Sequence, residues 1–139
     1  MEGCGLCLWE RQSYRLIGYN DSCYAMICKA PLKPGHVIVL PKRHVLSASD
    51  FSTNEASEFL DLIERVKNVV QEKYGEGLLV VQHGRGYASE KHLHYHVLPS
   101  KGSLRTLVSS YEGVLEREEI PREGLRAMRD LILNGRKSI

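Results

Sequence analysis

Hydrophobic and polar positions along the first part of the chain predict short strands followed by one long helix. Residues 13–18 and 22–28 are short runs that contain Tyr, Ile and Met, and the turn-forming pair Asn20-Asp21 separates them. This pattern is typical of two antiparallel strands joined by a tight turn. Residues 36–41 (HVIVLP) are a β-branched run that ends at a proline, and they predict a third strand.

A long amphipathic helix is predicted after residue 52. Ser52 and Glu55 have the spacing of a capping box, in which each side chain bonds the other residue's backbone amide. Beyond them, apolar residues recur at intervals of three and four, at Phe59, Leu62, Ile63, Val66, Val69, Val70 and Tyr74. Gly75 and Gly77 end the pattern. About 22 residues at about 1.5 Å each give a helix roughly 33 Å long, enough to cover one face of a sheet.

The remaining pattern completes an α+β domain. Residues 78–82 (LLVVQ) and 91–98 predict two further strands, joined by the polar connector HGRGYASE. Pro121 precedes an apolar periodicity that predicts a C-terminal helix. Strands interrupted by one long helix predict a mainly antiparallel sheet that this helix covers on one side. The length and the lack of internal repeats predict one domain over residues 1–139.

Composition and charge exclude several function classes. The chain contains 42% hydrophobic and 26% charged residues, which is ordinary for a globular protein. Its net charge of +2, with basic and acidic residues interspersed, predicts neither a nucleic-acid groove nor a membrane-binding face. No apolar run approaches the roughly 18 residues of a membrane span, and the start MEGCGLCLWER lacks the order of a signal peptide. We therefore expect a cytoplasmic protein whose four cysteines are reduced thiols or metal ligands.

Three histidines alternate with apolar residues in HLHYHV, residues 92–97. If this segment is a strand, the three imidazoles face a cleft and the apolar residues between them enter the core. Three interpretations are open: polar residues on a half-exposed strand, zinc ligands, or an imidazole nucleophile that attacks phosphorus while its neighbours handle protons. The connector favours phosphate, because its glycines and Ser89 could offer amides and a hydroxyl to an anion.

The run HLHYHVL, residues 92–98, resembles the signature of the histidine triad family of nucleotide hydrolases and nucleotidyltransferases. The segment PGHVIVLPKRH, residues 34–44, is similar to the family's proline-glycine-histidine strand, and the long helix follows where the family has one. The resemblance covers most of residues 1–99. It implies an α+β, HIT-like fold of about five antiparallel strands, a homodimer, and a nucleotide substrate, with a purine mononucleotide conjugate expected.

The resemblance also implies roles for individual residues. His94 would be the nucleophile that attacks the α-phosphate of a nucleoside 5′-phosphate conjugate and forms a nucleotidyl-histidine, from which water releases a nucleoside monophosphate. His96 would contact the phosphate or assist the leaving group. Ser89 matches a phosphate-contacting serine, and Gln82 matches an asparagine that touches phosphate or ribose. Expected substrates are phosphoramidates, adenylylated amines and dinucleoside polyphosphates.

Two departures from the family pattern keep alternatives open. Ala88 stands where many members have glutamine, and Cys28 stands where many have an acidic residue that binds the ribose hydroxyls. Ribose recognition is then looser or arises elsewhere. A nucleotide-binding or scaffold protein with weak turnover is therefore an alternative. The segment PLKPGH is also similar to the dinucleoside polyphosphate phosphorylases, so transfer to phosphate is a second alternative.

Cys4 and Cys7 form a C-x-x-C pair, which supplies two zinc ligands but not a complete site. Some family members and the related uridylyltransferases complete such a pair with two histidines, which here correspond to His44 and His92. The resemblance thus implies a closed, structural zinc. One alternative is that Cys4 and Cys7 are two unrelated thiols near the N-terminus. Another is a catalytic metal held by all three triad histidines. His36 and His83 have no marked partner, and we assign neither a catalytic role.

Overall fold

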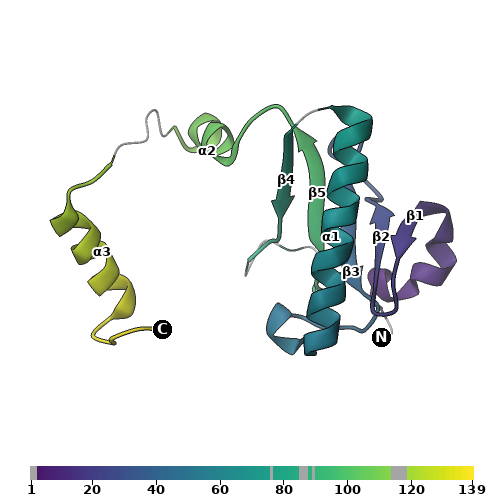
Figure 1. Cartoon of the computed structure of the whole chain (residues 1–139), viewed down its shortest axis with the longest axis horizontal. Coiled ribbons are helices and arrows are strands. Elements are labelled where there is room, and N and C mark those ends of the chain that lie inside the picture. The colour runs from purple at the N-terminus through teal and green to yellow at the C-terminus, as the bar shows by residue number, and fades with distance from the viewer. Residues whose placement is uncertain (1–2, 76, 85–87, 89, 114–118) are drawn as a thin grey trace. The chain divides into compact units, whose positions relative to one another are not determined.

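A computed structural model describes residues 3–75, 77–84, 88, 90–113 and 119–139 of the chain (Figure 1). The chain divides into two units, Met1–Ser103 and Leu104–Ile139. The first unit holds a sheet and one long helix, and the second holds two shorter helices. Of the helices described, none is both long enough and apolar enough to cross a membrane.

The first unit is built on a five-stranded antiparallel sheet with the strand order β1-β2-β3-β5-β4. Its strands are β1 (Leu16–Tyr19), β2 (Cys23–Ile27), β3 (Val37–Pro41), β4 (Gly77–Val81) and β5 (Tyr95–Ser100). The predicted α+β class is confirmed, and so is the expectation of about five antiparallel strands. The strand predicted at residues 13–18 is wrong at its start, because residues up to Arg15 belong to a 3₁₀-helical segment, η1 (Gly5–Arg15).

One face of the sheet is covered by the helix α1 (Thr53–Tyr74), as the periodicity predicted (Figure 1). The capping box between Ser52 and Glu55 is present, and Gly75 ends the helix in the left-handed conformation with φ of 66°. The helix buries Phe59, Leu62, Ile63, Val66 and Val70 against Cys23, Ala25, Val37, Val39 and Val97 of the sheet. Each such large apolar side chain contributes about 1.5–3 kcal/mol by leaving water. Val69 and Tyr74 share the predicted periodicity but are exposed.

The opposite face of the sheet is covered by η1, which the sequence pattern did not predict. Alternate residues of β2 and β3 face this side, and the buried cluster there comprises Cys4, Leu6, Tyr24, Met26, Ile38 and Leu40. The Trp9 and Tyr24 rings pack with centroids 4.9 Å apart, and the Tyr24 hydroxyl donates to the Leu6 carbonyl at 2.8 Å. Contacts with the sheet, rather than the local pattern of apolar residues, therefore determine the conformation of η1. The same contacts fix the position of Cys4 and Cys7.

The strand that carries the histidine triad begins later than predicted. Because β5 starts at Tyr95, His96 is the one triad histidine within the sheet. In the segment before it, the Leu93 amide donates to the carbonyl of Val45, in the loop after β3, at 2.8 Å. The premise of one continuous strand under all three histidines is wrong. The apolar residues between the histidines are nonetheless buried or half-buried, as expected.

The second unit contains α2 (Leu104–Glu112) and α3 (Arg122–Leu133). The helix predicted after Pro121 is confirmed as α3, with Pro121 at its N-cap and Asn134 in the left-handed conformation at its C-cap. The helix α2 was not predicted from the sequence. That residues 1–139 form a single domain stays a prediction.

Two glycines allow steric crowding to be separated from backbone strain. Gly35 has φ of 90°, and a Cβ there would meet the Tyr74 ring at 2.7 Å and Pro99 at 2.8 Å. Gly75 has φ of 66° with open space around it. We expect Gly75→Ala to lower the free energy of unfolding by about 1 kcal/mol, and Gly35→Ala by about 3 kcal/mol, because overpacking adds to the left-handed strain. Urea unfolding measures both losses, and equal values would contradict the crowding.

Candidate functional site

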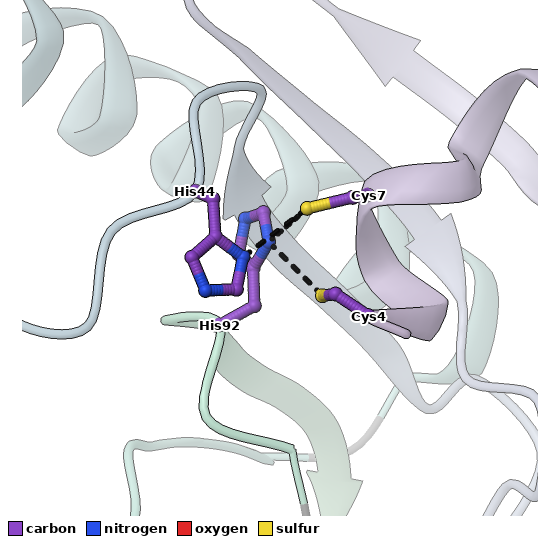
Figure 2. A group of neighbouring side chains, drawn as sticks. All are labelled: Cys4, Cys7, His44 and His92. Carbon is purple, nitrogen blue, oxygen red and sulfur yellow. Dashed lines mark hydrogen bonds between the residues drawn. The ribbon is translucent and has the colours of Figure 1, made fainter. Parts of the chain in front are cut away.

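Four side chains from distant parts of the sequence converge in the first unit. Cys4 and Cys7 at the start of η1 meet His44 from the loop after β3 and His92 from the segment before β5, as Figure 2 shows. Their ligand atoms all lie within 4.8 Å of one another. Cys7 Sγ lies 3.2 Å from His44 Nδ1 and 3.3 Å from His92 Nδ1, and Cys4 Sγ lies 3.6 Å from His92 Nδ1. The structure thus brings together the four residues that the resemblance implied as metal ligands.

Hydrogen bonding determines which nitrogen of His92 faces the sulfurs. His92 Nε2 lies 2.8 Å from the carbonyl oxygen of Pro41, which can only accept, so Nε2 carries the ring proton. Nδ1 then carries no proton, and its lone pair lies beside the thiols. A neutral imidazole with an unprotonated nitrogen is the form that binds a metal. Burial lowers the pKa of His92 and so keeps the ring neutral, while burial raises the pKa of the Cys4 thiol. Two sulfurs and two imidazoles are the donor set of a closed tetrahedral zinc site.

The backbone of His92 also orients the next histidine. His94 Nδ1 lies 2.8 Å from the His92 carbonyl oxygen, so Nδ1 donates and carries the ring proton. His94 Nε2 is therefore left with a free lone pair on a half-buried ring. An imidazole of this tautomer can attack an electrophile, and the carbonyl stabilises the positive charge that then develops on the ring.

His96 is held by a second chain of hydrogen bonds. The Leu32 amide donates to His36 Nδ1 at 3.1 Å, so the His36 proton is on Nε2, which lies 2.8 Å from His96 Nδ1. His96 Nδ1 accepts, and its own proton is on Nε2. Among the described residues, this buried Nε2 has no hydrogen-bond partner. Burial, and then the neighbouring histidines, lower the pKa of His96 to about 4, so the ring is neutral near pH 7 and offers one N–H donor.

His36 and His83 are residues of the site that sequence reasoning missed. The His83 ring packs edge-on against His96, with centroids 5.2 Å apart, and the His36 ring lies 5.0 Å from it. The pairing register explains both contacts, because His96 lies opposite Ile38 of β3 and Val81 of β4. His36 and His83 are each two residues from those positions and so lie diagonally across from His96 on the same face. That register could have revealed them, but it depends on which strands pair.

A cavity of about 610 Å³ lies beside His83 and the first two histidines of the triad. Its lining includes His94, His83, Gln82 and, from the segment before β5, Glu90 and Lys91. Cavities of a few hundred Å³ that carry a small number of polar groups are the usual form of small-molecule sites. This one places His94 on the wall of a space large enough for part of a nucleotide.

Four further positions were singled out in the sequence as contacts to phosphate or ribose or as departures from the family pattern. Gln82 is at the cavity, and its amide donates to the neighbouring His83 carbonyl at 2.5 Å. Ser89 lies outside the described residues. Ala88 is part of the cavity lining, where it presents a methyl group. Cys28 follows β2, and its thiol lies 3.7 Å from the Ala30 carbonyl oxygen.

Comparisons with known proteins agree with this architecture. The family model of the HIT domain matches residues 10–103. The chain is similar to a HIT family protein from Bacillus subtilis of known crystal structure, with a TM-score of 0.72, 17% sequence identity, and coverage of 99% of this chain and 100% of that one. At that identity the likeness shows the fold.

Two curated relatives are enzymes. The chain is 32% identical over 96 residues to a bis(5′-adenosyl)-triphosphatase from Dictyostelium discoideum, covering 67% of this chain and 64% of that protein. It is 25% identical over 105 residues to an adenosine 5′-monophosphoramidase from Candida albicans, covering 70% of this chain and 68% of that protein. The chain thus spans less than two thirds of the length of the first relative.

The environment of His96 predicts an unusual titration. Its pKa of about 4 lies below the ordinary 6.5, so protonation favours the unfolded chain. The stabilisation from keeping the ring neutral is complete above pH 6.5 and is lost as the pH falls toward 4. We expect the His96 ring signal in NMR spectra to titrate near pH 4, with its assignment made by His96→Asn. A midpoint near 6.5 would contradict the buried relay from His36.

Proposed function

The chain belongs to the HIT domain family, and from this membership we propose that it is an enzyme that hydrolyses nucleoside 5′-phosphate conjugates or transfers their nucleotidyl group. The observation that carries the proposal is the pairing of two imidazoles in complementary states. His94, which lines the cavity, has a free lone pair on Nε2, while His96 has its single proton on Nε2. One nitrogen can attack phosphorus and the other can donate to a phosphate oxygen.

The reaction proceeds in two steps. His94 Nε2 attacks the α-phosphorus, the bond to the leaving group breaks, and a nucleotidyl-histidine forms. The hydrogen bond from Nδ1 to the His92 carbonyl stabilises the imidazolium, at the 2.8 Å separation found here. His96 donates its Nε2 proton in a hydrogen bond to a phosphate oxygen, and Gln82 and Ser89 add further contacts. Water then attacks the same phosphorus and releases the nucleoside monophosphate.

The substrates that we propose are dinucleoside polyphosphates, phosphoramidates and adenylylated amines, with a purine nucleotide preferred. The two curated relatives support this range, because one acts on a bis(adenosyl) triphosphate and the other on an adenosine phosphoramidate. Cys28 offers no carboxylate for the ribose hydroxyls, so we expect weak discrimination at the ribose. If inorganic phosphate replaced water in the second step, the same site would act as a phosphorylase.

We assign the metal cluster to a structural zinc. Its ligands would be Cys4, Cys7, His44 and His92, whose donor set, neutral His92 tautomer and mutual proximity suit tetrahedral zinc. Zinc supplies folding free energy in such closed sites and leaves no open position for substrate. It would connect the N-terminus to the segment that precedes His94.

A second candidate function is nucleotide binding with little turnover. Ala88 favours this function. Its side chain in the cavity lining is a methyl group, which cannot donate a hydrogen bond to a leaving group and so cannot assist turnover. We further propose that the protein is a homodimer in the cytoplasm, with no nucleic-acid or membrane partner; these proposals rest on the resemblance and the composition.

Replacing the nucleophile tests the enzyme directly. We expect His94→Ala to lower turnover of an adenosine phosphoramidate by at least about 10³-fold, because no other described imidazole has its hydrogen-bonding arrangement. Mass spectrometry of protein quenched during turnover should find AMP attached to a peptide containing His94 in the parent protein and none in the variant.

The matched control for this experiment is Gln71→Ala, on the exposed part of α1, which should turn over normally. Retained activity in His94→Ala would overturn the covalent mechanism. Tight AMP binding by a parent protein that forms neither product nor adduct would favour the binding function instead.

Metal content tests the zinc assignment. We expect about one zinc per chain in the parent protein and in Cys28→Ser, and strong loss in Cys7→Ser, because Cys7 lies within 3.3 Å of both ligand histidines and Cys28 is outside the cluster. Loss of metal should also lower the melting temperature. Elemental analysis and thermal unfolding measure the two effects. Full zinc in Cys7→Ser, together with loss in His94→Ala, would instead indicate a metal on the triad.

A further inference from the structure

His83 lies at a place where it can act on the departing group. It follows β4, and its ring packs against His96 with centroids 5.2 Å apart at 72°. Val81 lies opposite His96 where the antiparallel pairing of β4 and β5 ends, and the chain beyond Val81 continues toward the residues that precede β5. His83 thus flanks His96 on the side of His94, whereas His36 flanks it on the other side.

The surroundings of His83 suit contact with a substrate. Its side chain is exposed and lines the same cavity as His94. Among the described residues, its ring has neighbours in aromatic packing but no hydrogen-bond partner, in contrast to His36, His92 and His94. Glu90 and Lys91, which are charged residues in the described part of the cavity lining, are also exposed. The imidazole of His83 is therefore free to bind and to exchange a proton with a ligand or with water.

The imidazoles of His94 and His96 already have other roles in the proposed reaction. His94 uses Nε2 as the attacking atom and Nδ1 to bond the His92 carbonyl. His96 is a neutral ring whose Nδ1 already accepts from His36, so full transfer of its remaining proton would leave an imidazolate. A neutral imidazole can hydrogen-bond a phosphate oxygen, but it is a poor acid for a departing amine or alkoxide. The first step needs a proton from elsewhere.

We propose that His83 is the general acid that protonates the leaving group in the reaction under "Proposed function", on which this inference rests. As the bond from His94 Nε2 to phosphorus forms, the bond to the leaving oxygen or nitrogen breaks, and its electron pair takes a proton from the His83 imidazolium. In the second step neutral His83 takes a proton from the attacking water. The electron pair of the phosphorus–nitrogen bond returns to His94 Nε2, and His83 regains its starting state.

Substrates that differ in their need for an acid test this role. The morpholidate of AMP expels an amine that requires a proton, whereas the p-nitrophenyl ester of AMP expels a stable phenolate that does not. We expect His83→Ala to slow AMP attachment to His94 by about 10²-fold or more with the morpholidate, and by less than about threefold with the nitrophenyl ester. Added imidazole should restore part of the loss, because the site is open to solvent.

Two further variants complete the experiment. His83→Gln retains a polar side chain of moderate size but cannot carry the proton, so it should show the same selective loss; it also serves if His83→Ala folds poorly, as judged by thermal unfolding. Gln71→Ala should slow neither substrate. Equal losses with both substrates, or no loss with the morpholidate, would overturn the role of His83 while the proposed function stands. A parent protein inactive on both substrates would overturn the proposed function itself.

Discussion

The environment of His92 is the constraint on which both parts of the site depend. Its Nε2 bonds the Pro41 carbonyl at the end of β3, its Nδ1 faces two thiols from the N-terminal segment, and its own carbonyl accepts from His94. Each bond fixes the next one. With the ring proton of His92 on Nε2, the lone pair of Nδ1 faces the sulfurs. With His94 Nδ1 donating to the His92 carbonyl, the lone pair of His94 lies on Nε2. A fully buried residue, His92, thus sets the tautomer of the half-buried His94.

The fold was predictable where local chemistry and periodicity agree. The capping box at Ser52 and the three- and four-residue spacing after it predicted α1, and short apolar runs predicted β2, β3 and β4. The segment η1 was not predicted in this way, because two apolar residues, Leu6 and Trp9, are too few to define a period; they pack beside Tyr24 on the far face of the sheet. Its conformation is a property of the sheet it covers.

In the candidate site, too, some residues were predictable from local sequence and others only from the way that strands pair. The metal residues and His94 came from motifs and a family resemblance, whereas His36 and His83 came from strand pairing. The strict alternation in HLHYHV suggested three equivalent histidines on one strand face. Because β5 begins only at Tyr95, His92 and His94 lie outside the sheet. His92 bonds the Pro41 carbonyl instead, and His94 bonds the His92 carbonyl. The departure from regular structure is therefore what makes the three imidazoles chemically different.

That difference follows from burial as much as from position. A site with several imidazoles within about 5 Å of one another cannot hold them all protonated, because their charges repel and the buried rings lose hydration. His96, with His36, His83 and His94 around it, is the ring where these costs add, and its pKa falls to about 4. His96 therefore carries no positive charge near neutral pH. As a neutral ring, His96 can offer its remaining N–H to an anionic substrate without giving up a proton.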